Sequence, residues 1–361
     1  MLKTIILFLL MLTIITVVHE FGHFVTAKLF KLYVYEFSIG MGPKIYSKKG
    51  KETTFSLRAF PIGGFVSMAG EDDKENLAND VDKPNIEIPF ERTLPGIKPL
   101  KRIIVMVSGV LMNFILAFII MSMTFLANGF YNKSAEPIID TVVENYPAYK
   151  AGIQKGDKIL AVSFDNGYSI EPKDFSEVQS VFSLYDGKGN MHLKLLRGEE
   201  TLLVDVKPVF DEEQNAYFIG ITSLENEVVE VNFSNCFVIA FDYLISAMKL
   251  ILVTLLGLFR GVGFNNLSGP VGVYTVTEEV VSYGFATYMS LIALISLNVG
   301  VFNLLPLPIF DGGRIFITLI EMIIRKPINK KVENAIMSAS VVLLIMLVLF
   351  VTFKDITKLI K

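Results

Sequence analysis

Apolar segments long enough to cross a bilayer, which takes about 20 residues, recur along the chain. The first is interrupted between residues 4 and 18 by threonines alone, and the third contains Pro306 and Pro308, which should break a helix at 306–308. The pattern predicts a mainly α-helical polytopic membrane protein with about four transmembrane helices. These helices are expected at residues 1–30, 101–131, 285–324 and 335–353.

A fifth apolar segment, residues 237–259, can be interpreted in two ways, because Asp242 and Lys249 interrupt it. It could span the membrane or lie on its surface. The seven-residue spacing of the two charges suits an amphipathic surface helix, which we expect over 235–260 within a longer segment 211–284.

Basic residues predict the orientation of the chain in the membrane. They gather in the loop 31–100 and again around Arg325 and Lys326. The positive-inside rule places both regions in the cytoplasm. The part of the chain after the second span is then extracytoplasmic. The third span can return the chain to the cytoplasm at Lys326 only if 237–259 does not cross the membrane.

The cytoplasmic loop should contain a small sheet. Apolar and polar residues alternate over 33–40 and 53–58, and residues 60–66 continue the pattern with turn residues. These patterns together predict a membrane-associated β-hairpin, with an open strand edge that could receive an extended chain. Residues 71–95 are charged and irregular, and they predict a mobile linker.

The extracytoplasmic region 134–210 has the pattern of a small α/β domain. Asp174 should cap a helix over 174–182. Strand patterns occur at 138–143, 158–164, 191–196 and 202–206. The stretch 146–160, a short helix and a Gly-Asp turn before a strand, resembles the signature of bacterial PDZ domains. Such domains commonly bind a peptide by strand addition, although a passive spacer of the same shape remains the alternative.

Composition narrows the class of protein. The chain has 361 residues, of which 52% are hydrophobic, and its formal net charge is −3. These values exclude a disordered or nucleic-acid-binding protein and favour an integral membrane protein with a soluble portion. The single cysteine, Cys236, excludes an internal disulfide and a cysteine-based zinc site.

Candidate chemistry lies at the end of the first apolar segment, in the run His19-Glu20-Phe21-Gly22-His23. Residues four apart share a helix face, so His19 and His23 can bind one metal ion. Glu20 lies one position round the helix, where it can take a proton from an activated water. Ionisable residues in an apolar segment favour a functional site over an incidental pairing.

A catalytic zinc ion usually takes three protein ligands, so one more is needed. His192 alternates with apolar residues on a strand outside the membrane and is expected to face solvent. Asp311 is the better candidate, because it follows the proline break, where Gly312 and Gly313 would let another helix approach closely. The alternative is that Asp-Gly-Gly is only a turn at the membrane boundary.

Together these runs resemble the signatures of the bacterial site-2 proteases, which are intramembrane zinc metalloproteases. The resemblance extends over nearly the whole chain. Its motifs are His19-Glu20-Phe21-Gly22-His23, Gly109-Val110-Leu111-Met112-Asn113, Pro61-Ile62-Gly63-Gly64-Phe65-Val66, Leu267-Ser268-Gly269-Pro270-Val271-Gly272 and the run from Asn303 to Gly313. The most similar type is the regulator-of-sigma-factor type, with one PDZ domain here where some relatives have two.

The resemblance implies one Zn²⁺ per chain, bound by His19, His23 and Asp311, with Glu20 as the catalytic base. It also implies that Asn303, Asn113 and Asn298 contact the substrate strand or the oxyanion. Addition of the substrate as a strand to the hairpin edge would bring further contacts from Gly63, Gly64 and Phe65. The reaction would be regulated intramembrane proteolysis in a bacterial cell membrane. The partners would be the lipid bilayer and single-pass substrates such as anti-sigma factors or signal-peptide remnants, with no nucleic acid.

A non-enzymatic membrane adaptor is the competing hypothesis. It would combine a PDZ domain with a helical anchor and use its metal for structure alone, which calls for a closed site with four ligands. The sequence offers three credible ligands and a glutamate at the position of a base, and this favours catalysis. A transporter fits less well, because the chain has no inverted repeat of broken helices.

Overall fold

The computed structural model describes residues 2–71, 81, 87–212, 216–264, 267–326 and 328–360. By contacts the chain divides into two compact units. Unit 1 comprises Met1–Thr124 and Ser268–Lys361, and unit 2 comprises Phe125–Leu267. Of the predicted linker 71–95, residues 72–80 and 82–86 lie outside the described residues, and the described part contains the short 3₁₀ helix η1 (Phe90–Arg92).

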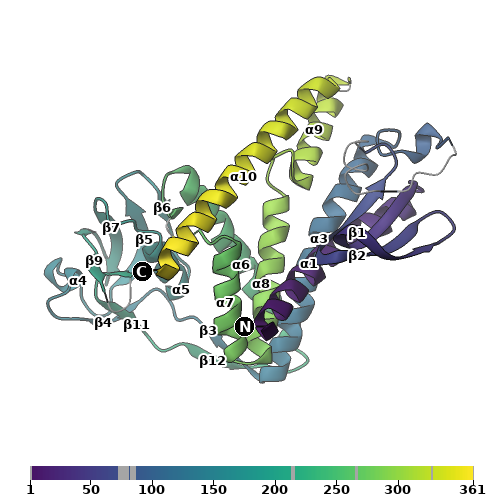
Figure 1. Ribbon diagram of the computed structural model, residues 1–361. Coiled ribbons are helices and arrows are strands. Elements are labelled where there is room, and N and C mark those ends of the chain that lie inside the picture. Colours follow the sequence, from purple (N-terminus) through teal and green to yellow (C-terminus); the bar gives the residue numbers. More distant parts are fainter. Residues whose placement is uncertain are drawn as a thin grey trace. The chain divides into compact units, whose positions relative to one another are not determined.

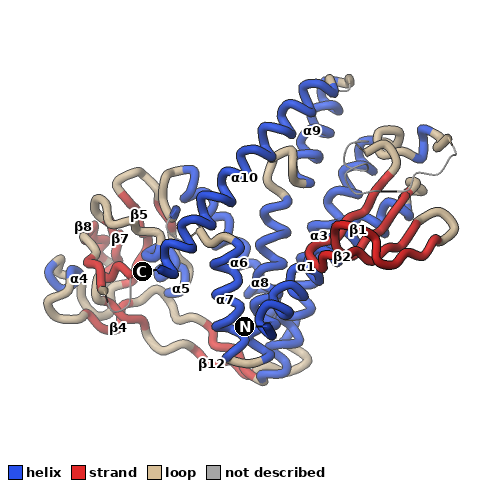
Figure 2. Tube along the Cα trace, in the orientation of Figure 1, coloured by secondary structure: helices blue, strands red, loops and turns tan. Residues whose placement is uncertain are grey.

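Most of unit 1 is helical (Figures 1 and 2). Its helices are α1 (Leu2–Leu29), α3 (Pro99–Asn128, which continues into unit 2), α7 (Pro270–Ser282), α8 (Phe285–Asn303), α9 (Asp311–Ile324) and α10 (Lys330–Ile360). In the described part of the chain, five helices are long and apolar enough to span a membrane: α1, α3, α6, α8 and α10. Four coincide with the predicted spans, and the fifth, α6 (Cys236–Phe259), is the segment that the sequence left ambiguous.

Glycines let the helices of unit 1 approach one another closely. A Cβ atom on Gly22 of α1 would overlap the carbonyl of Ser108 on α3. On α8, a Cβ atom on Gly300 would lie 2.5 Å from the ring of Phe114 on α3. The Tyr288 hydroxyl of α8 also donates to the Leu7 carbonyl of α1 at 2.8 Å. Helices α1 and α8 are therefore held against α3 by close packing, as is common for small residues in membrane helices.

The predicted break in the third apolar segment is present, since α8 ends at Asn303 and α9 begins at Asp311. The sequence suggested that Gly312 and Gly313 let another helix approach closely. The nearest atoms to both glycines belong instead to the segment between α8 and α9. A Cβ atom on Gly312 would overlap the carbonyl of Leu304, and one on Gly313 would overlap that of Leu307. The glycines instead let the broken segment fold back onto the first turn of α9.

Helix α7 was not predicted, because its many β-branched residues have low intrinsic helix propensity. Its N-terminus is capped from another helix. The Asp355 carboxylate of α10 accepts the backbone N–H of Gly269 at 2.8 Å and that of Gly272 at 2.9 Å. These bonds satisfy donors that the first turn of a helix leaves unpaired. Tertiary contact therefore compensates for weak local propensity.

The predicted hairpin is present and longer than expected, with strands β1 (Val34–Lys49) and β2 (Thr54–Met68). The first half of β1 pairs with residues 64–68 on one side and with 54–57 on the other. Among the described residues, 64–68 pairs with β1 alone. The other edge of this segment faces α1, because the Val66 N–H donates to the Glu20 carboxylate at 3.1 Å.

A buried ion pair lies inside this sheet. Glu36 is fully buried, and the Arg58 guanidinium donates to its Oε1 atom from Nη2 at 2.7 Å and from Nε at 3.1 Å. Ser56 also donates to the same oxygen. The Lys44 Nζ atom lies 3.5 Å from the other carboxylate oxygen of Glu36. Removing Glu36 would leave the buried Arg58 charge uncompensated, so the pair favours a single register for the two strands.

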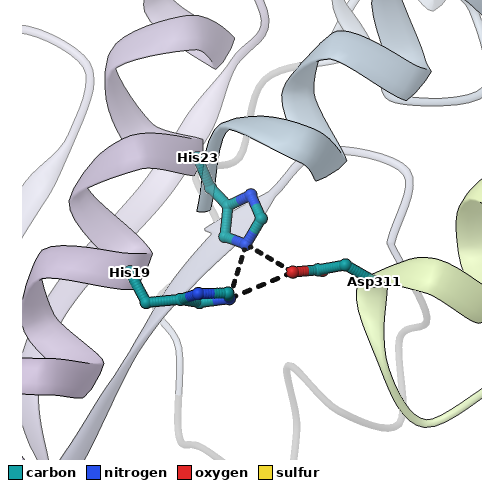
Figure 3. A group of neighbouring side chains, drawn as sticks. All are labelled: His19, His23 and Asp311. Atoms are coloured by element: carbon teal, nitrogen blue, oxygen red, sulfur yellow. Dashed lines mark hydrogen bonds and ion pairs between the residues drawn. The ribbon is translucent and has the colours of Figure 1, made fainter. Parts of the chain in front are cut away.

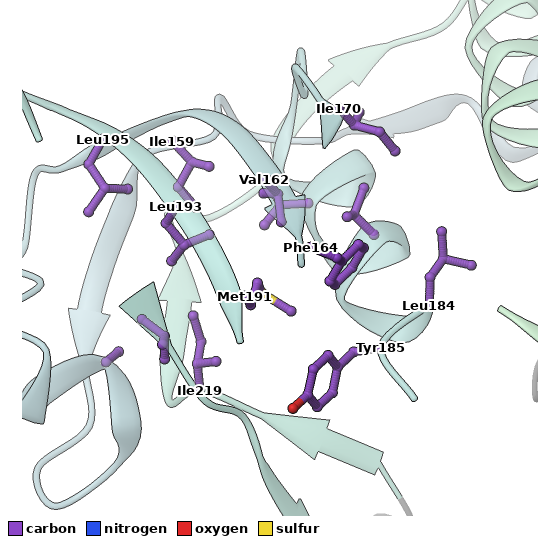
Figure 4. Packing of buried hydrophobic residues seen from close by; sticks show 14 of the residues in the cluster. Ile159, Val162, Phe164, Ile170, Leu184, Tyr185, Met191, Leu193, Leu195 and Ile219 are labelled. Atoms are coloured by element: carbon purple, nitrogen blue, oxygen red, sulfur yellow. The ribbon is translucent and has the colours of Figure 1, made fainter. Parts of the chain in front are cut away.

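Unit 2 is built around a four-stranded sheet in the order β6-β5-β7-β8. Its strands are β5 (Lys158–Phe164), β6 (Ser169–Ile170), β7 (Met191–Arg197) and β8 (Glu200–Val206). Helix α5 (Phe175–Ser183) begins at Asp174, whose carboxylate accepts the Glu177 N–H at 3.0 Å. The predicted strands and the capped helix are thus confirmed, and side chains from both form one core (Figure 4).

Shorter elements complete unit 2. Three two-stranded pairs form between β4 and β11, β3 and β12, and β9 and β10. These elements are β3 (Phe130–Lys133), β4 (Ile139–Val142), α4 (Pro147–Lys150), β9 (Val209–Asp211), β10 (Ala216–Phe218), β11 (Ile221–Ser223) and β12 (Glu227–Glu230).

The helix expected over 235–260 is confirmed as α6 (Cys236–Phe259). It contacts the rest of unit 2 through polar groups: Lys249 lies 2.9 Å from the Glu177 carboxylate, and the Tyr168 hydroxyl donates to the Val253 carbonyl at 2.5 Å. These contacts fix one face of α6. Its position at the membrane surface stays a prediction.

His192 generates a prediction about pH. Its Nδ1 atom lies 2.7 Å from the Asp205 carboxylate and its Nε2 atom 2.8 Å from that of Asp165. The hydrogen bond to Asp205 raises the pKa of His192 above its ordinary value; partial burial opposes the shift and Asp165 adds to it. A raised pKa stabilises the fold fully below the unfolded-state pKa, about 6.5, and the effect disappears as pH rises through the folded-state pKa.

We therefore expect His192→Gln to destabilise β7 and β8 most below about pH 6.5, with the difference from the wild type shrinking above it. Hydrogen exchange of these strands in the full chain, corrected for intrinsic exchange rates, measures the effect. Asp205→Asn is the matched control and should reproduce the pH dependence. A difference that is constant with pH would contradict the prediction.

Candidate metal centre

Three side chains that could bind a metal meet in unit 1 (Figure 3). His19 and His23 lie one turn apart on α1, and Asp311 is the first residue of α9. The Asp311 Oδ2 atom lies 3.0 Å from Nε2 of His19 and 3.3 Å from Nε2 of His23, and the two Nε2 atoms are 3.1 Å apart. Among the described residues, this is the group of His, Cys, Asp and Glu side chains able to hold an ion.

The donor set fits zinc. Tetrahedral zinc with bonds of about 2.0–2.1 Å places its ligand atoms about 3.3 Å from one another, close to the spacing found here. The Asp311 Oδ2 atom is also buried without a hydrogen-bond donor, which an ion would satisfy. Two imidazoles and one carboxylate leave a fourth position open, as catalytic zinc sites do.

Neighbouring groups hold both imidazoles in place. The His23 Nδ1–H donates to the Val105 carbonyl of α3 at 2.8 Å, which leaves Nε2 with a lone pair for a metal. The His19 Nδ1 atom lies 3.3 Å from the side-chain amide of Asn113, which is fully buried. The atom nearest to the ring is Nδ2, and the buried Oδ1 atom has no partner among the described residues. Rotation of the amide by 180° would let Oδ1 accept the Nδ1 proton and free Nε2 in the same way.

Glu20 lies between α1 and the hairpin. It follows His19 directly, so its side chain projects about 100° further round the helix. Its Oε2 atom accepts the Val66 N–H of β2 at 3.1 Å. The carboxylate is thus held beside both the histidine-bearing helix and the strand.

Gly109 of α3 belongs to the site, although the sequence analysis named it only as part of a motif and gave it no role. A Cβ atom there would overlap Nε2 of His23 and lie 2.8 Å from Cε1 of His19. Space for the two rings therefore requires glycine. The four-residue spacing from Gly109 to Asn113, which places both on one helix face, is the sequence signal that could have indicated this.

The six expected substrate-binding residues fall into three places. Gly63, Gly64 and Phe65 precede Val66 on β2, and a Cβ atom on Gly64 would be 3.5 Å from Val17 of α1. Asn113 contacts His19 instead of an open surface. Asn298 and Asn303 are half-buried on α8. Substrate contact by these residues stays a prediction.

Comparisons with known proteins agree with this chemistry. The profile of Peptidase family M50, the site-2 proteases, matches residues 7–347. A Clostridium perfringens protein with the provisional name zinc metalloprotease is 36% identical over 96% of this chain and 97% of its own length. Relatives with the same provisional name from Fusobacterium nucleatum and Staphylococcus aureus are 33% and 28% identical, each over 99% of both chains.

A profile match over most of the length is consistent with the apolar helices and with the donor set of two histidines and one aspartate. The chain therefore belongs to Peptidase family M50 and is a membrane-associated zinc metalloprotease.

Proposed function

We propose that this protein is an intramembrane endopeptidase that cleaves single-span membrane proteins. One observation carries the proposal: His19 and His23 lie in α1, and α1 is long and apolar enough to span a bilayer. Asp311 follows a break in another apolar segment. A charged site of this kind is costly in lipid and is retained where it has a function.

The proposed ligands are His19, His23 and Asp311, and Glu20 is the proposed base. Zinc, when bound, polarises the scissile carbonyl and lowers the pKa of water to about 7. Glu20 takes the proton from the attacking water and returns it to the nitrogen of the leaving amine. The Val66 N–H holds the Glu20 carboxylate on the side of α1 that faces β2.

The substrate is proposed to bind as a strand. Carbonyls of a membrane helix are hidden in hydrogen bonds, so the helix must unwind before cleavage. Addition to the segment that contains Gly63, Gly64 and Phe65 would keep it extended, since main-chain hydrogen bonds along a strand edge bind peptides of many sequences. Asn303 and Asn298 would contact this strand or stabilise the oxyanion. Asn113, which is fully buried beside His19, would take part only through that ring.

Unit 2 is proposed to contain a single PDZ domain, which lies outside the cytoplasm. Loop 31–100 is proposed to lie in the cytoplasm. Support comes from the stretch 146–160, from the four-stranded sheet with its capped helix α5, and from the basic residues of the loop. The domain would exclude bulky ectodomains or bind a freshly cut terminus. Substrates would be of the anti-sigma-factor or signal-peptide-remnant type, in a bacterial plasma membrane.

The adaptor hypothesis is less well supported. A structural zinc site takes four protein ligands, and the described residues bring three together. Glu20 lies next to His19 in sequence. A catalytic zinc site needs a base at this position, whereas a structural zinc site does not.

Glu20→Gln tests the proposal. Cleavage of a tagged single-span substrate with a trimmed ectodomain should fall by about a hundredfold or more, because general acid–base catalysis contributes that much. Zinc content should be unchanged. Asp311→Asn should lose both zinc and activity. Cleavage by Glu20→Gln at the wild-type rate, measured in detergent with purified protein, would disprove the assignment.

Gly109→Ala tests the space around the imidazoles. The added methyl would overlap the His23 ring, so we expect loss of zinc with the fold retained. Zinc analysis of monodisperse protein measures this. Gly300→Ala is the matched control, because its methyl would crowd the ring of Phe114 on the same helix α3. This variant should keep its zinc. Equal zinc loss in both variants would show a general packing defect instead.

A further inference from the structure

Glu71, three residues beyond the end of β2, uses both of its carboxylate oxygens. Oε2 accepts the Met68 N–H of β2 at 2.9 Å. Oε1 accepts from Nη1 of Arg314 on α9 at 2.8 Å. The Glu71 side chain is 10% exposed and that of Arg314 is 30% exposed. This carboxylate therefore joins the end of the hairpin to the helix that begins with Asp311.

The contact closes a ring around the metal centre. Arg314 lies one turn after Asp311 on α9, and Asp311 lies against the histidines of α1. On α1, Glu20 accepts the Val66 N–H of β2, and Val66 lies two residues before Met68. Helix α1, strand β2 and helix α9 are thus linked pairwise, and Glu71 supplies the link between the strand and α9.

Helix α9 depends on such links because few of its residues are packed. Of its 14 residues, the buried ones are Gly312, Gly313 and Thr318, of which two have no side chain. It also follows a broken segment, which constrains its direction less than a continuous helix would. A charged hydrogen bond in partly buried surroundings is stronger than one in water.

We propose that Glu71 and Arg314 are positioning residues for peptide hydrolysis. Their ion pair fixes the first turn of α9, and with it Asp311, relative to the strand β2 that holds the substrate. This inference rests on the proposed strand addition and the proposed ligand role of Asp311. Without the pair, the metal centre and the scissile carbonyl lose their common alignment.

A second ion pair on α9 provides a control. Glu321 lies seven residues after Arg314, about 10 Å further along the helix. Its Oε2 atom accepts from Arg102 of α3 at 2.9 Å, and its Oε1 atom accepts the Ile328 N–H at 3.0 Å. Like Glu71, it joins one arginine and one backbone N–H, with 16% of its side chain exposed. It lies outside the ring.

The experiment compares Glu71→Gln with Glu321→Gln in the full-length protein. Each change is isosteric, keeps an acceptor for the backbone N–H and removes the charge that faces the arginine. Two quantities are measured: the rate of zinc loss to excess EDTA, and kcat and KM for a single-span substrate. For Glu71→Gln we expect zinc loss about tenfold faster and kcat about tenfold lower, typical of groups that orient metal ligands, with KM nearly unchanged.

Glu321→Gln should resemble the wild type in both measurements. Arg314→Gln should reproduce Glu71→Gln, and Arg314→Lys, which keeps the charge, should restore most of kcat and zinc retention. Equal effects in Glu71→Gln and Glu321→Gln would mean that both pairs merely anchor α9, and would overturn the inference. So would unchanged zinc loss and kcat in Glu71→Gln.

Failure of the proposed function has a different signature. If the wild type does not cleave the single-span substrate, the proposed proteolysis is overturned. If Glu20→Gln cleaves equally well, the proposed role of Glu20 as the base is overturned. The rates of zinc loss still decide whether Glu71 and Arg314 position Asp311. The two hypotheses can therefore be overturned separately.

Discussion

The structure depends on bringing one carboxylate and two imidazoles within 3.3 Å of one another inside apolar helices. Such groups are costly in surroundings that offer no water, and the cost is met only if an ion and neighbouring polar groups satisfy all of them. Close helix packing follows from this need. Gly22 and Gly109 let α1 and α3 approach until Asn113 and the Val105 carbonyl reach the rings.

The same constraint explains the irregular segment between α8 and α9. A continuous helix would have paired its own carbonyls, whereas the break lets Asp311 begin a new helix beside α1. Gly312 and Gly313 make room for the returning backbone. Irregular backbone is tolerated at membrane depth where protein packs against it. Here the first turn of α9 packs against the carbonyls of Leu304 and Leu307.

Much of this arrangement could be predicted from local patterns. Helical periodicity placed His19 and His23 on one face, the prolines marked the break before Asp311, and alternation indicated the hairpin. Contacts between distant segments left no such signal. The cap that Asp355 supplies to α7 and the ion pair between Glu71 and Arg314 join residues far apart in sequence, so no local spacing encodes them.

The position of Asp311 has a consequence for biosynthesis. The histidines are made first, but their third partner emerges from the ribosome only after both the hairpin and unit 2. A nascent chain synthesised at about 5–20 residues per second carries an incomplete donor set for most of its translation. The nascent chain therefore lacks a complete donor set, and with it hydrolytic competence, until Asp311 has been synthesised.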